Sequence, residues 1–150
     1  VDRRDRRRTL YAEAYKAAVA WVEMLYRVRR RDPERPYELA ARFHEVQECV
    51  DFHQGWIDAE HIAFGRAYRH LVAEVKRLTF DEIKEAWRNP PCDPNDGFSL
   101  EAEVHPPVAE AKRTFVADLR DHMSLWPWRR QALKRRYRNE APELVQPNHE

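Results

Sequence analysis

Apolar side chains recur at alternating spacings of four and three residues over two long stretches of this chain, the pattern of a buried α-helical face. In the first stretch, about residues 2–31, two adjacent apolar rows predict a broad buried face. The rows are Leu10, Ala14, Ala17, Trp21, Met24 and Val28, and Tyr11, Tyr15, Ala18, Val22 and Leu25. The prolines at 33 and 36 end this helix, because each disfavours helical geometry in the residue before it.

A second long helix is predicted over 36–57, with Pro36 at its first position. Its apolar row is Leu39, Phe43, Val46, Val50, His53 and Ile57, and Cys49, Phe52 and Trp56 widen it, which suggests a central helix. The apolar pattern resumes as far as Leu78 but changes phase between Gly55 and Gly65. We therefore expect a kink or a short break there, with Asp58 as a candidate N-cap, in a helix that continues or kinks to 78.

Shorter helices are predicted in the C-terminal half. Thr79 and Glu82 have the spacing of a capping box, which predicts a short helix over 80–88. A further helix opens at Pro106 and is broken at Pro127, and a short basic helix follows over 128–138. The chain is therefore expected to be one all-α domain, residues 1–138, a helical bundle with a frayed tail over 139–150.

Composition excludes several classes of protein. The 150 residues include only 3 glycines and 2 cysteines, which argues against Gly-rich phosphate loops, most all-β folds and a disulfide framework. No stretch approaches the roughly 20 apolar residues of a membrane span. The formal net charge of +1 conceals an excess of positive charge over 1–31 and of negative charge over 32–60. Pairing between the two long helices is the simplest explanation of that segregation.

Candidate catalytic and metal-binding groups are few. His53 lies in an apolar row, where an imidazole needs partners for both nitrogens, and together with Asp58 and His61 it forms the set of candidate buried functional residues. A di-metal carboxylate bundle uses Glu-x-x-His motifs, and Asp58 with His61, or Asp118 with His122, matches only in part. No nucleophile stands beside a base. We therefore expect no metal, no cofactor and no enzymatic activity.

The segment 125–138 combines large apolar and aromatic residues with positive charge. Leu125, Trp126 and Trp128 suit docking to an apolar surface, and the cations that follow suit an anionic partner. The candidate partner-binding residues are Leu125, Trp126, Trp128, Arg129, Arg130, Lys134, Arg135, Arg136 and Tyr137. Tryptophans beside arginines also suit an anionic membrane surface. A solvated basic helix remains the simpler alternative.

The N-terminal residues carry a further expectation. The chain starts at Val1 with an Arg-rich cluster of the kind that follows a membrane span on its cytoplasmic side. Arg6 to Ala14, Tyr26 to Arg31, Phe52-His53-Gln54, and Ala67-Tyr68 with Leu71-Val72 resemble segments of small Arg-rich helical proteins of high-GC actinobacteria and their phages. That resemblance implies a membrane-spanning segment before the helical domain, and it implies no biochemical activity.

The leading hypothesis is a non-enzymatic helical module that binds another protein. It is expected in the cytoplasm, at the inner face of the membrane if it is tethered there. The alternative is a nucleic-acid-binding regulator that uses the basic helix 129–138. A metal-dependent enzyme around His53, Asp58 and His61 is the weakest alternative. A homodimer stays open, because long helices with two apolar rows can complete a bundle between two copies.

Overall fold

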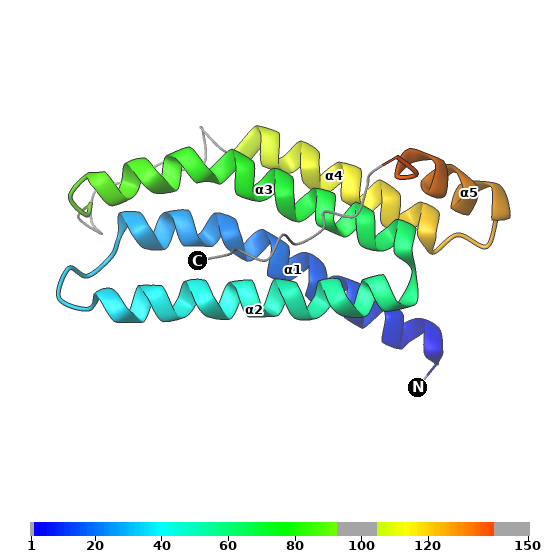
Figure 1. Ribbon diagram of the computed structural model, residues 1–150, viewed down its shortest axis with the longest axis horizontal. Helices are drawn as coiled ribbons and strands as arrows, with labels where there is room; N and C mark the ends of the chain where they lie inside the picture. The colour runs from blue at the N-terminus through cyan, green and yellow to red at the C-terminus, as the bar shows by residue number, and fades with distance from the viewer. Residues whose placement is uncertain (1, 93–104, 140–150) are drawn as a thin grey trace, which may run out of the picture.

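Five α-helices make up the computed structural model, which describes residues 2–92 and 105–139. They are α1 (Arg3–Arg29), α2 (Pro36–Glu60), α3 (Ile62–Arg88), α4 (His105–His122) and α5 (Pro127–Arg136), and these residues include no strand. The predicted all-α bundle is confirmed. The first four helices run up and down alongside one another, and α5 folds back at one end (Figure 1). The predicted frayed tail lies, apart from Asn139, outside the described residues.

The centre of the bundle is α3, which packs against α1, α2, α4 and α5. The expectation that the second helix would be central is wrong. That helix buries only the row Leu39, Val46, Val50, His53 and Ile57, whereas Cys49, Phe52 and Trp56 are exposed. A single buried row is enough for α2 because it packs on α1 and α3 from one side.

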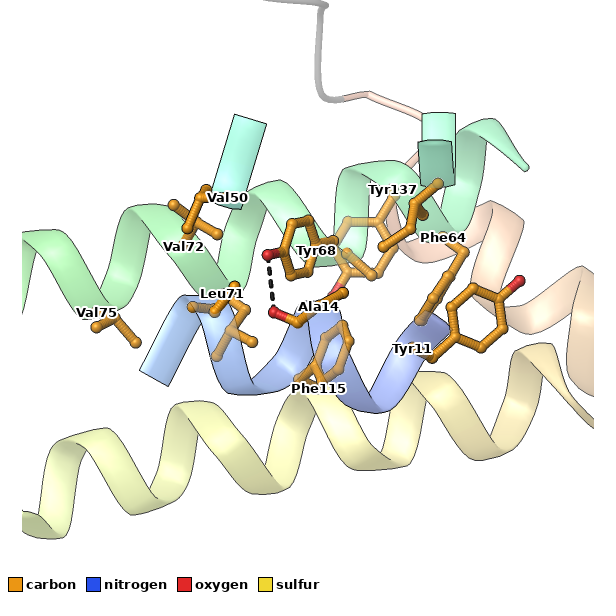
Figure 2. Packing of buried hydrophobic residues seen from close by; sticks show 14 of the residues in the cluster. Tyr11, Ala14, Val50, Phe64, Tyr68, Leu71, Val72, Val75, Phe115 and Tyr137 are labelled. Atoms are coloured by element: carbon orange, nitrogen blue, oxygen red, sulfur yellow. Dashed lines mark hydrogen bonds between the residues drawn. The ribbon is translucent and has the colours of Figure 1, made fainter. Parts of the chain in front are cut away.

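The broad face predicted for the first helix is confirmed, since α1 buries residues of both rows against its neighbours. Aromatic rings fill the space where it meets α3 and α4. The centroids of Tyr11 and Phe64 lie 4.8 Å apart, and Tyr15 stacks on Phe115. The Tyr68 hydroxyl donates a buried hydrogen bond of 2.8 Å to the Ala14 carbonyl, which ties α3 to α1 (Figure 2).

A reversal at a single residue separates α2 from α3, so the predicted short break is present and the alternative, one helix that continues or kinks to 78, is wrong. His61 has extended φ and ψ of −160° and 106°, and its Nδ1 accepts the Phe64 N–H, so His61 and not Asp58 is the N-cap. The hairpin closes tightly because Gly65 has no side chain. A Cβ on Gly65 would lie 1.9 Å from Asp58 Oδ1. The Gln54 amide bridges the turn by donating to Asp58 Oδ1 and to the Gly65 carbonyl, both at 2.9 Å.

The predicted capping box at Thr79 is also wrong, because α3 continues without a break to Arg88. Thr79 is buried, and its hydroxyl donates to the Val75 carbonyl one turn earlier at 2.8 Å. Its side chain is thus satisfied inside a helix and has no capping role. Arg31 holds the far end of α3 by donating to the carbonyls of Ala86 and Asn89, each at 2.8 Å.

None of the helices in the described part of the chain is both long enough and apolar enough to cross a membrane.

Candidate functional site

Three large apolar side chains protrude where α4 turns into α5. Leu125, Trp126 and Trp128 are 81%, 63% and 62% exposed. Pro127 begins α5 at a position where a proline costs no hydrogen bond, and the Trp126 N–H donates to Ser124 Oγ at 3.1 Å. We call Leu125, Trp126 and Trp128 the apolar corner. The sequence placed these residues in a partner-binding segment, and their exposure agrees with that role.

The C-terminal half of α5 anchors the helix. Leu133 and Tyr137, four residues apart, are both buried. The Tyr137 hydroxyl donates to Asp118 of α4, and Arg136 pairs with Asp118 at 2.8 Å and with Asp121 at 2.6 Å. Burial raises the pKa of Asp118, and the contacts with Tyr137 and Arg136 oppose that shift. The assignment of Tyr137 to partner binding is therefore corrected, because its ring belongs to the core.

The other cations of α5 remain near the surface. Arg130, Lys134 and Arg135 are exposed, and the guanidinium of Arg129 lies 5.2 Å from the centre of the Trp128 ring. Positive charge therefore continues from the apolar corner along the helix. Arg136 differs from these four because two carboxylates already neutralise it.

The candidate buried residues have separate neighbours. His53 is buried, burial lowers its pKa, and its Nδ1 has no hydrogen-bond partner among the described residues. Asp58 accepts from Gln54 and pairs with Arg69 at 2.8 Å. His61 caps α3. Within residues 2–92 and 105–139, no three His, Cys, Asp or Glu side chains are grouped so that they could hold a metal ion.

A polar cleft of about 310 Å³ lies beside the apolar corner. The start of α1, the α2–α3 turn, the end of α4 and α5 meet there, at one end of the bundle (Figure 1). We call it the basic cleft. Its lining residues are Arg7, Glu60, His61, His122, Pro127, Arg130, Gln131 and Lys134.

A hydrogen-bonded chain forms one wall of the basic cleft. The Tyr11 hydroxyl donates to Glu60 Oε2 at 2.8 Å and lies 2.9 Å from His122 Nε2. Since the hydroxyl has one proton and the carboxylate can only accept, Nε2 of His122 must carry the proton it donates to Tyr11. The His122 ring stacks on Phe64 with centroids 4.5 Å apart. Burial, and after it the neighbouring His61, lowers the pKa of His122 to about 4, so the ring is neutral at pH 7.

Sequence reasoning missed this cleft, although it considered two of its histidines. It paired His122 with Asp118 by spacing, but Asp118 faces Tyr137 whereas His122 faces Tyr11. Tyr11 and His122 are 111 residues apart, and no local motif connects them. The ring of His61 lies 4.6 Å from that of His122, a contact that only the folded bundle creates.

No protein-family model matches the chain, and the searches of curated proteins and of solved structures found no match either.

Proposed function

We propose that this protein is a non-enzymatic helical module that binds another protein through the apolar corner. The observation that carries the proposal is the exposure of Leu125, Trp126 and Trp128 side by side at the turn between α4 and α5. Tryptophan is enriched among the residues that dominate binding energy at interfaces. Pro127 lies between the two tryptophans and fixes its own backbone φ, which limits the backbone freedom that the segment would lose on binding.

The charge around the corner specifies the chemistry of the partner. Arg129, Arg130, Lys134 and Arg135 surround or follow the apolar residues, so the fitting partner offers an apolar pocket rimmed by carboxylates. The same chemistry suits a position at the inner, anionic face of a membrane in the cytoplasm. The Arg-rich first turns of α1 lie at this end of the bundle and add to that potential (Figure 1).

The alternative function, a nucleic-acid-binding regulator that uses residues 129–138, loses part of its support in the structure. It relied on six cations and on Trp126, Trp128 and Tyr137 as stacking residues. The two tryptophans are exposed, but Tyr137 is buried and Arg136 is paired with two carboxylates.

The proposal that the module is not an enzyme draws support from the basic cleft. The residues that line the cleft include no Ser, Thr or Cys that could act as a nucleophile. Burial raises the pKa of the adjacent Tyr11 so far that the Tyr11 hydroxyl keeps its proton.

Photocrosslinking tests the proposal. A photoreactive amino acid replaces Leu125 in the intact protein in cells, and the same replacement of Tyr37, which is 87% exposed at the other end of the bundle, is the matched control. The expected result is a defined crosslinked protein at position 125 and not at 37. Crosslinks to a second copy would identify a homodimer as the partner. Crosslinks to nucleic acid alone, or the same products at both positions, would refute the proposal.

A further inference from the structure

The basic cleft holds more positive charge than its own residues neutralise. Arg7 of α1 and Arg130 and Lys134 of α5 line it, and Glu60 is the only carboxylate among its lining residues. Glu60 is already engaged, because Oε2 accepts from Tyr11 and Oε1 lies 3.6 Å from Arg7 Nε. A formal charge of about +2 is therefore left facing a concave surface, where neighbouring cations reinforce one another's field.

The donors in the basic cleft lack partners. The side chains of Arg130 and Lys134, one helical turn apart, form no hydrogen bond or ion pair with any residue of the described ranges. Arg7 Nε is buried and makes no hydrogen bond there, because Glu60 is too distant. Since His61 Nδ1 accepts the Phe64 N–H, Nε2 of His61 carries the ring proton and is a further donor.

A buried acceptor also has no partner. The Nε2–H of His122 is donated to Tyr11, so His122 Nδ1 presents a lone pair, and this buried atom has no donor among the described residues. A buried polar atom without a partner costs roughly 1–3 kcal/mol, so such atoms are satisfied by water or by a ligand. Arg7, His61 and His122 all line the same cleft, so the two buried atoms without partners in the described part of the chain, Arg7 Nε and His122 Nδ1, belong to residues of its wall.

We propose that the basic cleft binds a terminal phosphate monoester. A phosphate monoester dianion has three terminal oxygens, one for each of the cations Arg7, Arg130 and Lys134, and its two negative charges match the charge of about +2 in the cleft. A carboxylate has only two oxygens and one charge. The His61 Nε2–H supplies a neutral donor from a further residue that lines the cleft. A volume of about 310 Å³ holds a phosphate and a small substituent.

The lowered pKa values of His61 and His122 agree with the gathering of positive charge around this cleft. Burial lowers the pKa of His61, and Lys134, Arg130 and Arg7 lower it further, in that order. The three cations therefore surround one imidazole from two different helices. The titratable and charged groups that face His61 and His122 from the packed elements are these cations, Glu60, the Tyr11 hydroxyl and the other imidazole.

Isothermal titration calorimetry with inorganic phosphate and with glycerol 3-phosphate tests the proposal on the intact chain. The expected result is saturable binding of one ligand per chain. Arg130→Gln and Lys134→Gln are each expected to weaken it by roughly tenfold or more, because each removes a charge-assisted hydrogen bond. Arg135→Gln is the matched control, since it removes the same charge from α5 outside the cleft, and it should change affinity by less than about threefold.

The folding of the variants is not at risk, because Arg130 and Lys134 hold no described residue in place. Melting temperatures measured without ligand should match that of the wild type, and added phosphate should raise the wild-type value while leaving that of the Arg130→Gln, Lys134→Gln double variant unchanged. Absence of saturable binding, or equal binding by the double variant, would overturn the proposal.

Vesicles distinguish the two sources of this phosphate chemistry. Vesicles of phosphatidylcholine with phosphatidic acid carry the monoester on a lipid, and vesicles of phosphatidylcholine alone do not. Binding to the first that glycerol 3-phosphate displaces would identify a lipid headgroup, and binding only of the soluble ester would identify a free ligand. Vesicle binding that neither competition nor the double variant affects would contradict a role for the cleft. The apolar corner is unchanged in every variant, so this test and the crosslinking test fail independently.

Discussion

Substitution of alanine at the two helical glycines should have opposite effects on stability. Alanine favours helix over glycine by about 1 kcal/mol, so Gly→Ala in a helix is ordinarily stabilising. At Gly55 of α2, no atom lies within 4 Å of the added Cβ. At Gly65 of α3, the added Cβ would lie 1.9 Å from Asp58 Oδ1 and 3.2 Å from Asp58 Cα.

The cost at Gly65 follows from these contacts. Asp58 must move its carboxylate, which breaks the bond from Gln54 and the pair with Arg69 at 2.8 Å, each contributing up to about 1 kcal/mol. Rotation of the side chain leaves the contact with Asp58 Cα, so α2 and α3 must also separate slightly, at roughly 1–3 kcal/mol. After subtracting the helical gain, Gly65→Ala should destabilise the protein by about 2 kcal/mol.

Urea denaturation and thermal melting measure the difference. Gly65→Ala should lower the melting temperature by about 4–8 °C, and Gly55→Ala should raise it by up to about 4 °C. In an Asp58→Ala background the cost of Gly65→Ala should fall by about 1 kcal/mol, because the carboxylate contact is gone. Equal stabilisation by both Gly→Ala changes would refute the tight hairpin at His61.

Three further predictions concern buried polar groups. The pKa of His122 is about 4 in the folded protein and 6.5 for the free side chain, so as the pH falls the imidazole is protonated in the unfolded chain before it is protonated in the folded one. The free energy of unfolding should therefore fall by about 2 kcal/mol from pH 7 to pH 5, and it should fall less steeply in His122→Gln. Identical pH profiles of the two proteins would count against this prediction. Tyr137→Phe leaves the buried Oδ2 of Asp118 without the Tyr137 donor, while Arg136 stays paired with Oδ1. It should cost roughly 1–3 kcal/mol in urea denaturation, and an unchanged midpoint would be the contrary result. Tyr68→Phe removes the bond to Ala14 and should cost about 1 kcal/mol by the same assay, so a stabilised variant would contradict that bond.

The helices were predictable where local rules decide them. Apolar periodicity identified both rows of α1, and Pro36 marked the start of α2. Pro127 was predicted to break the preceding helix, but α4 already ends at His122, and Pro127 is the first residue of α5. The reversal at His61 was not predictable, because a change of helical phase is the same signal for a kink as for a hairpin. The choice depends on the close approach of Gly65 to Asp58, which is a tertiary contact. Thr79 likewise has one side chain suited both to capping and to a helix interior.

The residues of the candidate site were likewise predictable where a local pattern identifies them and not where the fold brings distant segments together. Trp126 and Trp128 were identifiable because a tryptophan on each side of a proline in a basic segment is a local pattern. The burial of Tyr137 could have been suspected from its spacing of four residues from Leu133, which together form the buried side of α5. The basic cleft draws on four separate segments of the chain, so no window of sequence contains its signal.

The most direct test of the proposed function is the affinity of the protein crosslinked at position 125 for the wild type and for the Trp126→Ala, Trp128→Ala double variant. A tryptophan that is an interface hot spot costs about 2 kcal/mol or more when truncated to alanine, so loss of both should weaken binding at least 100-fold. The melting temperature should stay within a few degrees of the wild type, because both rings are exposed. Unchanged affinity in the double variant, or loss of folding, would contradict the account of the apolar corner as the docking surface.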